Sequence, residues 1–172
     1  MCLSEKQAKE YKDYLESLAI NNSSEMFYNS GKDHAVVLYG VLLKHARLTA
    51  RFFCEGCMSP IWSDLTFRDA FVDALRREGF SVKILTHKNC SPDFSWLPQE
   101  LQDKIELKPA SEEALKDIFS HFKTSSCNFS VFDSEMFRYE YDVENFKAYG
   151  NFNDSEIAGS MINLFDRCYL AS

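Results

Sequence analysis

Helical and alternating patterns of apolar residues divide the chain into one ordered succession of elements. Apolar residues recur three and four positions apart in segments 4–18, 31–47, 66–78, 111–122 and 154–169, which predicts five amphipathic helices. Short runs rich in Phe, Val, Ile and Tyr predict strands at 25–28, 48–54, 80–85, 104–107, 129–133, 136–142 and 146–149. The core order is therefore β-α-β-α-β, followed by a short strand and a helix, a three-stranded meander and a closing helix.

The connections between these segments predict how the strands pair. Gly79 stands between a predicted helix and the next strand, where a helix commonly ends in a glycine. A strand, a helix and a second strand in this order favour a right-handed crossover with parallel strands. The last three strands have short connections, which favour antiparallel pairing. The predicted fold class is α/β, with a mixed β-sheet flanked by α-helices.

The chain has the length and composition of one ordinary domain. It has 172 residues, of which 45% are hydrophobic, and contains no repeat or Pro/Gly-rich linker. We expect a single domain over 1–172, with a helical extension at 1–24 and the core at 25–172. The start is charged where a secretory signal would be apolar, and the apolar run 35–43 is shorter than the roughly 20 residues that span a bilayer. We therefore expect a cytoplasmic protein without membrane contact, whose six cysteines are reduced thiols.

The C-terminal third contains the most informative motif. Ser126, Asn128 and Asp133 lie on one predicted strand, and Gly150 and Asn153 follow further along the chain. This layout resembles the phospholipase D-like superfamily, whose motif is His-x-Lys-x4-Asp followed by Gly-Ser-x-Asn. The resemblance in architecture covers about 25–169 and implies a phospholipase D-like fold.

The departures from that motif bear on activity. Counted back from Asp133, the family's nucleophilic His position holds Ser126, and its phosphate-binding Lys position holds Asn128. Asp133 and Asn153 match the family, so the resemblance implies a remnant site made of these four residues. A serine needs a base to activate it, and an asparagine cannot supply the lysine charge, so we expect phosphodiesterase activity to be lost. One motif per chain would also require a dimer to assemble a site with two such motifs.

The segment after Asp133 alternates polar and aromatic residues. Arg138 and Glu140 lie on the polar side, and Tyr139 and Tyr141 lie on the aromatic side. One interpretation makes Arg138 and Glu140 a surface that binds a ligand or partner. The other makes them cross-strand charge pairs on a solvated face.

Four further residues suggest a metal site as an alternative. The four residues are Cys54, Cys57, His87 and Cys90, and each of the pairs 54/57 and 87/90 follows a predicted strand. Three cysteines and one histidine are an accepted ligand set for structural zinc. The gap between the pairs is not a zinc-finger spacing, and cytosolic cysteines are often simply buried, so we predict no metal and no cofactor.

Isolated histidines and tryptophans complete the candidates. His34, His45 and His121 lie on predicted helices, and we expect them at the surface or its boundary. Trp62 and Trp96 lie in predicted connectors, where such rings either close one end of the sheet or anchor a partner.

The sequence favours a binding protein over an enzyme. The formal net charge is −7, which disfavours nucleic acid and anionic membrane surfaces as partners. We expect a non-catalytic phospholipase D-like domain whose partner is another protein or a second copy of itself. A remnant phosphodiesterase or nuclease and a zinc-stabilised adaptor are the two alternatives.

Overall fold

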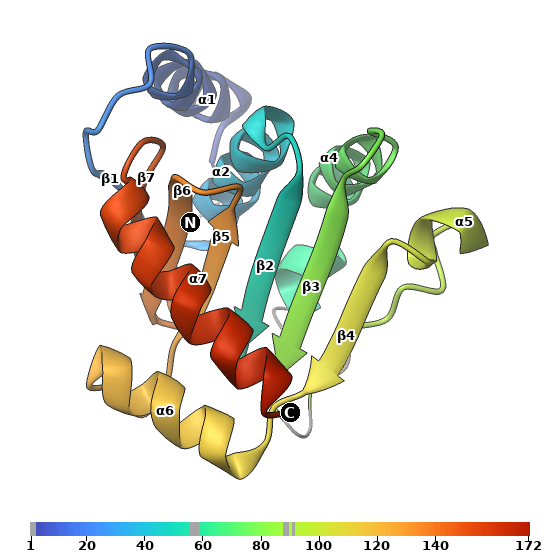
Figure 1. Ribbon diagram of the computed structural model, residues 1–172. Coiled ribbons are helices and arrows are strands. Elements are labelled where there is room, and N and C mark those ends of the chain that lie inside the picture. The colour runs from blue at the N-terminus through green and yellow to red at the C-terminus, as the bar shows by residue number, and fades with distance from the viewer. Residues whose placement is uncertain (1–2, 56–58, 88–89, 91) are drawn as a thin grey trace.

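Seven strands form one continuous sheet in the computed structural model, which describes residues 3–55, 59–87, 90 and 92–172. The sheet has the order β1-β7-β6-β5-β2-β3-β4 (Figure 1). The strands are β1 (Phe27–Asn29), β2 (Thr49–Cys54), β3 (Ser81–Thr86), β4 (Ile105–Pro109), β5 (Asn128–Phe132), β6 (Met136–Asp142) and β7 (Lys147–Asn151). The helices are α1 (Glu5–Ile20), α2 (Lys32–His45), α3 (Ser59–Trp62), α4 (Leu65–Leu75), α5 (Gln99–Gln102), α6 (Glu112–Phe122) and α7 (Ser155–Leu170).

The sheet is mixed, which confirms the predicted fold class. Strands β2, β3 and β4 are parallel neighbours, whereas β5, β6, β7 and β1 pair antiparallel. The two halves meet where β5 runs antiparallel to β2. Helix α4 makes the crossover that the parallel pair β2–β3 requires.

Helices cover both faces of this sheet (Figure 1). Helices α1, α2 and α4 lie on one face, and α6 and α7 lie on the other. Phe52 and Phe53 are neighbours on β2, yet they belong to the two different hydrophobic clusters on these faces. Side chains alternate across a strand, so one strand in the middle of the sheet supplies both cores.

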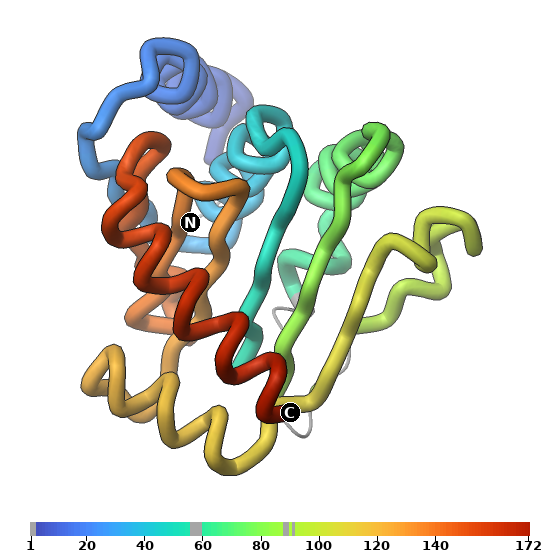
Figure 2. The backbone as a smooth tube through the Cα atoms, in the orientation of Figure 1, coloured from blue at the N-terminus to red at the C-terminus, as the bar shows by residue number. Residues whose placement is uncertain are grey.

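The helix boundaries follow capping residues. Ser4 and Gln7 form the expected capping box of α1, and Ser111 and Asp154 cap α6 and α7 as expected. Helix α7 runs diagonally over the sheet and ends beside β4, where the Ser111 N–H donates to Ser172 Oγ (Figure 2).

Helix α1 packs within the larger of the two cores. Its Leu15 and Leu18 are buried in the same cluster as Tyr39 and Phe52. The division into an extension at 1–24 and a core at 25–172 stays a prediction. In the described part of the chain, no helix is long and apolar enough to cross a membrane.

Replacing Gly150 by alanine is expected to destabilise the protein. Gly150 pairs with Phe27 on one side and Arg138 on the other, and a Cβ there would overlap the Phe137 carbonyl oxygen and the Phe27 ring. Overpacking of this kind costs about 1–3 kcal/mol of unfolding free energy, measurable by urea denaturation. Gly40→Ala is the matched control, because its Cβ would meet open space within α2 and should raise stability by up to about 1 kcal/mol. Equal stability of the two variants would contradict this account.

Candidate functional site

Asp133 joins two loops at one end of β5. It has a positive φ of 51° and follows the last residue of the strand. Its carboxylate accepts backbone N–H groups from Arg47 at 2.7 Å, Leu48 at 2.8 Å and Thr49 at 2.9 Å. Asp133 therefore links the C-terminal end of β5 to the N-terminal end of β2.

Asn128 lies at the opposite end of β5 and is fully enclosed. Its side-chain oxygen accepts the Glu55 N–H at 2.7 Å, and its amide nitrogen donates to Glu140 Oε1 at 2.6 Å. Glu55 in turn accepts the Cys127 N–H at 3.0 Å. Both ends of the Asn128 amide are thus used within the protein.

Ser126 precedes β5 and is partly buried. Its backbone N–H donates to Thr124 Oγ1 at 3.2 Å, and its carbonyl accepts from the same hydroxyl at 2.9 Å. His121 is exposed and its ring packs against Phe122. Within the described residues, no base makes a hydrogen bond to the Ser126 hydroxyl.

Asn153 lies at the Asp133 end of the sheet. Its side chain donates to the Asn22 carbonyl at 2.8 Å, and its backbone N–H donates to Asn151 Oδ1 at 2.8 Å. Asn22 and Asp133 line the same cavity of about 440 Å³. The structure therefore brings Ser126 near Asn128 but separates both from Asp133 and Asn153, which differs from the expectation of one remnant pocket.

Arg138 and Glu140 form an ion pair inside the protein. The exposed fraction of the side chain is 0% for Arg138 and 1% for Glu140, and Arg138 Nη2 donates to Glu140 Oε2 at 2.6 Å. Neither side chain can reach a ligand or partner, so the expected ligand surface and the alternative of a solvated face are both wrong for this pair. A partly exposed cross-strand ion pair does occur at the end of β6, where Lys147 Nζ lies 3.2 Å from Asp142 Oδ2.

The remaining donors of Arg138 are satisfied by elements far apart in sequence. Its Nε donates to Asn29 Oδ1 and its Nη1 to Tyr39 Oη, both at 3.3 Å, and Nη2 also lies 3.5 Å from the Phe146 carbonyl. The guanidinium carbon lies 5.0 Å from the centre of the Tyr39 ring, which adds a cation–π contact. We define Asn29, Tyr39, Asn128, Arg138 and Glu140 as the buried polar network.

Burial also sets the acidity of this network. Loss of hydration raises the pKa of Tyr39 to about 12, although the positive charge of Arg138 acts in the opposite direction. Desolvation alone would lower the pKa of Arg138, but the neighbouring Tyr39 and Glu140 outweigh it and raise the value. The arginine therefore stays charged, and the phenol stays neutral, throughout the physiological range.

Sequence reasoning missed two members of the buried polar network. Tyr39 lies in the predicted helix 31–47, and its hydroxyl also accepts a hydrogen bond from Ser130 Oγ at 3.5 Å. Asn29 follows directly after the predicted strand 25–28, and its amide donates to the Phe146 carbonyl at 2.9 Å. A buried arginine needs several acceptors, and that requirement is the only sequence signal for these two residues.

The proposed zinc ligands do not assemble within the described residues. Cys57 lies outside these residues, Cys54 is a buried thiol whose pKa is raised by desolvation, and Cys90 is disulfide-bonded. The disulfide differs from the expectation of six reduced thiols. In the part of the chain that the structure describes, no group of three or more His, Cys, Asp or Glu side chains could hold a metal ion.

The tryptophans and two of the histidines make internal contacts. Trp62 is buried in the larger core, and Trp96 packs against the same core with the Arg68 guanidinium 4.6 Å from its ring centre. His45 pairs with Glu16 at 2.7 Å. The His34 ring meets the Tyr11 ring edge-on, with centroids 4.8 Å apart.

Comparison with known proteins supplies the fold family. No protein-family model and no curated protein matches the chain. The solved structure of Nuc from Salmonella typhimurium, a phospholipase D family member, matches 84% of this chain and 95% of Nuc, with a TM-score of 0.55 and 16% identity. The chain has a phospholipase D-like fold.

A second solved structure shares this fold. TrmBL2, an archaeal chromatin protein described as showing a novel mode of DNA binding, matches 96% of this chain with a TM-score of 0.56 and 17% identity. The match spans 60% of TrmBL2, so this phospholipase D-like chain covers less than two thirds of that protein. At these identities the two likenesses concern the fold alone.

Removing one partner of the buried ion pair is expected to cost much more than removing both. Arg138→Met leaves the negative charge of Glu140 uncompensated in the core, and Glu140→Leu leaves the positive charge of Arg138 uncompensated. Each single variant should lose about 3–5 kcal/mol of unfolding free energy. The double variant Arg138→Met/Glu140→Leu should lose clearly less than the sum of the two single losses in urea unfolding. Additive losses would contradict a tightly coupled pair.

Alkaline unfolding provides a separate test of Tyr39. Because the folded-state pKa is raised from 10.0 to about 12, the tyrosine's contribution to stability is complete below pH 10 and is lost as pH rises to 12. A shift of this size corresponds to roughly 3 kcal/mol of unfolding free energy. Tyr39→Phe should therefore show a shallower fall of unfolding free energy between pH 10 and pH 12 than the wild type. An unchanged slope would show that Tyr39 does not titrate in this way.

Proposed function

We propose that the chain is a non-catalytic phospholipase D-like domain that works by binding a protein partner or a second copy of itself. The observation that carries this proposal is the double hydrogen bonding of Asn128 in the family's lysine position. An amide so held cannot neutralise a phosphoryl group, and its neighbours Glu55 and Glu140 would add negative charge beside any phosphate.

The serine in the nucleophile position supports the same proposal. Nucleophilic serines are activated by a base within hydrogen-bond reach, usually oriented by a third group. Among the described residues, the hydrogen bonds of Ser126 are those of its backbone with Thr124. No described base is in place to take the hydroxyl proton.

Charge argues against nucleic acid as the partner. The formal net charge of −7 disfavours a phosphate backbone, even though TrmBL2, which shares the fold, is described as a DNA-binding chromatin protein. A protein surface carries no such continuous line of phosphates, so we propose a protein partner or a second copy.

Hydrolysis of bis(p-nitrophenyl) phosphate tests the absence of catalysis. The wild type is expected to release nitrophenol no faster than the buffer alone, and Ser126→Ala should not change that rate. Ser125→Ala, at an exposed neighbouring position, is the matched control. Turnover that Ser126→Ala abolishes and Ser125→Ala retains would establish the alternative, an active phosphodiesterase. Sedimentation velocity on the same samples distinguishes a self-associating protein from one that needs a different partner.

A further inference from the structure

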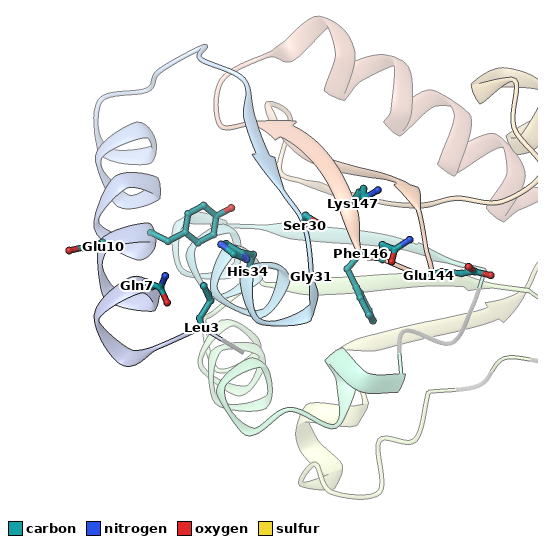
Figure 3. A pocket seen from close by; sticks show the side chains of 11 residues that line it. Leu3, Gln7, Glu10, Ser30, Gly31, His34, Glu144, Phe146 and Lys147 are labelled. Carbon is teal, nitrogen blue, oxygen red and sulfur yellow. The ribbon is translucent and has the colours of Figure 1, made fainter. Parts of the chain in front are cut away.

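The two edge strands of the sheet differ in what they offer a partner. One edge is β1, which has three residues, and Ser30 directly after it lines a cavity of about 750 Å³ beside α1 (Figure 3). The other edge is β4, which has five residues. Within the part of the chain that the structure describes, β4 pairs with β3 and no strand pairs with its outer side (Figure 1). An open edge of this length can extend a sheet by pairing with another strand.

The main chain of β4 presents alternate residues to the outer side. The Lys104 carbonyl accepts a backbone N–H of β3 at 3.0 Å, and the Ala110 N–H donates to a carbonyl at the end of β3 at 2.6 Å. The peptide groups of successive residues in a strand point to opposite sides, so the even-numbered residues turn toward β3. Ile105 and Leu107 therefore direct an N–H and a carbonyl outward, whereas Pro109 directs a carbonyl only.

The side chains of β4 divide into a charged face and an apolar face. Glu106 and Lys108 point toward α7, where the Tyr169 hydroxyl donates to Glu106 Oε2 at 3.4 Å and Lys108 Nζ donates to the Tyr169 carbonyl at 3.1 Å. Ile105 and Leu107 pack on the other face, against the larger core. Among the described residues, neither Glu106 nor Lys108 forms an ion pair. Because Tyr169 offers them neutral groups, two opposite charges remain available at this edge.

The sequence of β4 is complementary to itself when two copies run antiparallel. A two-fold axis at Leu107 places Glu106 opposite Lys108 of the second copy, and Lys108 opposite its Glu106. On the other face, Leu107 meets its own copy and Ile105 meets Pro109, so apolar residues also lie opposite each other. An axis at Glu106 or at Lys108 would instead place two glutamates or two lysines opposite each other, which is unfavourable. One register therefore satisfies both faces.

We propose that two copies of this chain pair antiparallel through β4, about a two-fold axis at Leu107, and form one sheet that continues across both copies. In this register the two Leu107 residues exchange backbone hydrogen bonds, and each Ile105 N–H donates to the Pro109 carbonyl of the second copy. Identical surfaces meet at such an axis, as in most homodimers. This inference rests on the proposed function, because it chooses the second copy as the partner and names the surface.

The size of the contact sets the expected strength. Two five-residue strands bury much less than the roughly 1,600 Å² of a standard interface. We therefore expect a weak dimer whose population rises with protein concentration.

Charge exchange on β4 tests this dimer by sedimentation velocity over a series of concentrations. The wild type should dimerise, whereas Glu106→Lys and Lys108→Glu should each raise the dimer Kd about ten- to hundredfold, because two attractive cross-strand pairs become two repulsive ones. An equimolar mixture of the two variants should dimerise again, because a strand with two lysines then faces a strand with two glutamates. The mixture also controls for the lost Tyr169 contacts, which both variants share.

A matched charge change elsewhere separates the edge from bulk charge. Glu10→Lys makes the same change on α1, where the side chain is 66% exposed, at the opposite side of the sheet from β4 (Figure 1). Exposed charges this far from the contact are screened by salt, so the dimer Kd should stay within about twofold of the wild type.

Amide hydrogen exchange locates the contact within β4. The N–H groups of Ile105 and Leu107 should gain protection as the concentration rises, whereas those of Glu106 and Lys108, which bond to β3, should be protected throughout. A monomer at every concentration, a dimer that neither charge variant weakens, or a mixture that stays monomeric would overturn the β4 pairing while leaving a binding domain with another partner or surface. Phosphodiester turnover in the previous assay would instead overturn the proposed function itself.

Discussion

The buried pair Arg138–Glu140 constrains the arrangement of everything around it. An ion pair costs several kcal/mol of desolvation when it leaves water, and it is tolerated only where the remaining donors and acceptors are satisfied. Here those partners come from β1, α2, β5 and the turn before β7. Because these elements are separated by up to 109 residues along the chain, the network forms only when sheet order, strand register and the seat of α2 are all correct.

The same network also encloses Asn128 at the start of β5. On the motif strand β5, the lysine position is occupied by an amide that binds a backbone N–H and a buried carboxylate. Asn128 is therefore part of the interior. Any binding partner must therefore contact residues outside this network.

The sequence predicted the elements well and their burial less well. The mixed sheet followed from strong local signals: alternating apolar runs, three side-chain caps and a glycine between α4 and β3. The short helices α3 and α5 were missed, because four residues carry no periodicity. Alternation along β6 revealed two faces but not that α2 covers the polar one, so Arg138 and Glu140 were expected in solvent. Likewise, the motif spacing places Asn128 and Asp133 five residues apart on one strand, roughly 16 Å, which no single small pocket spans.

The hydrogen bonds of Asn128 restrict which residues its position can accept. A lysine at this position would bring three donors and no acceptor, so the Glu55 N–H would lose its partner while a second cation entered a core that already encloses Arg138. One substitution would therefore damage the interior before it could help any chemistry. A lysine at position 128 would require matched changes at Arg138 and Glu140, so the interior of the protein, more than its surface, limits what this position can become.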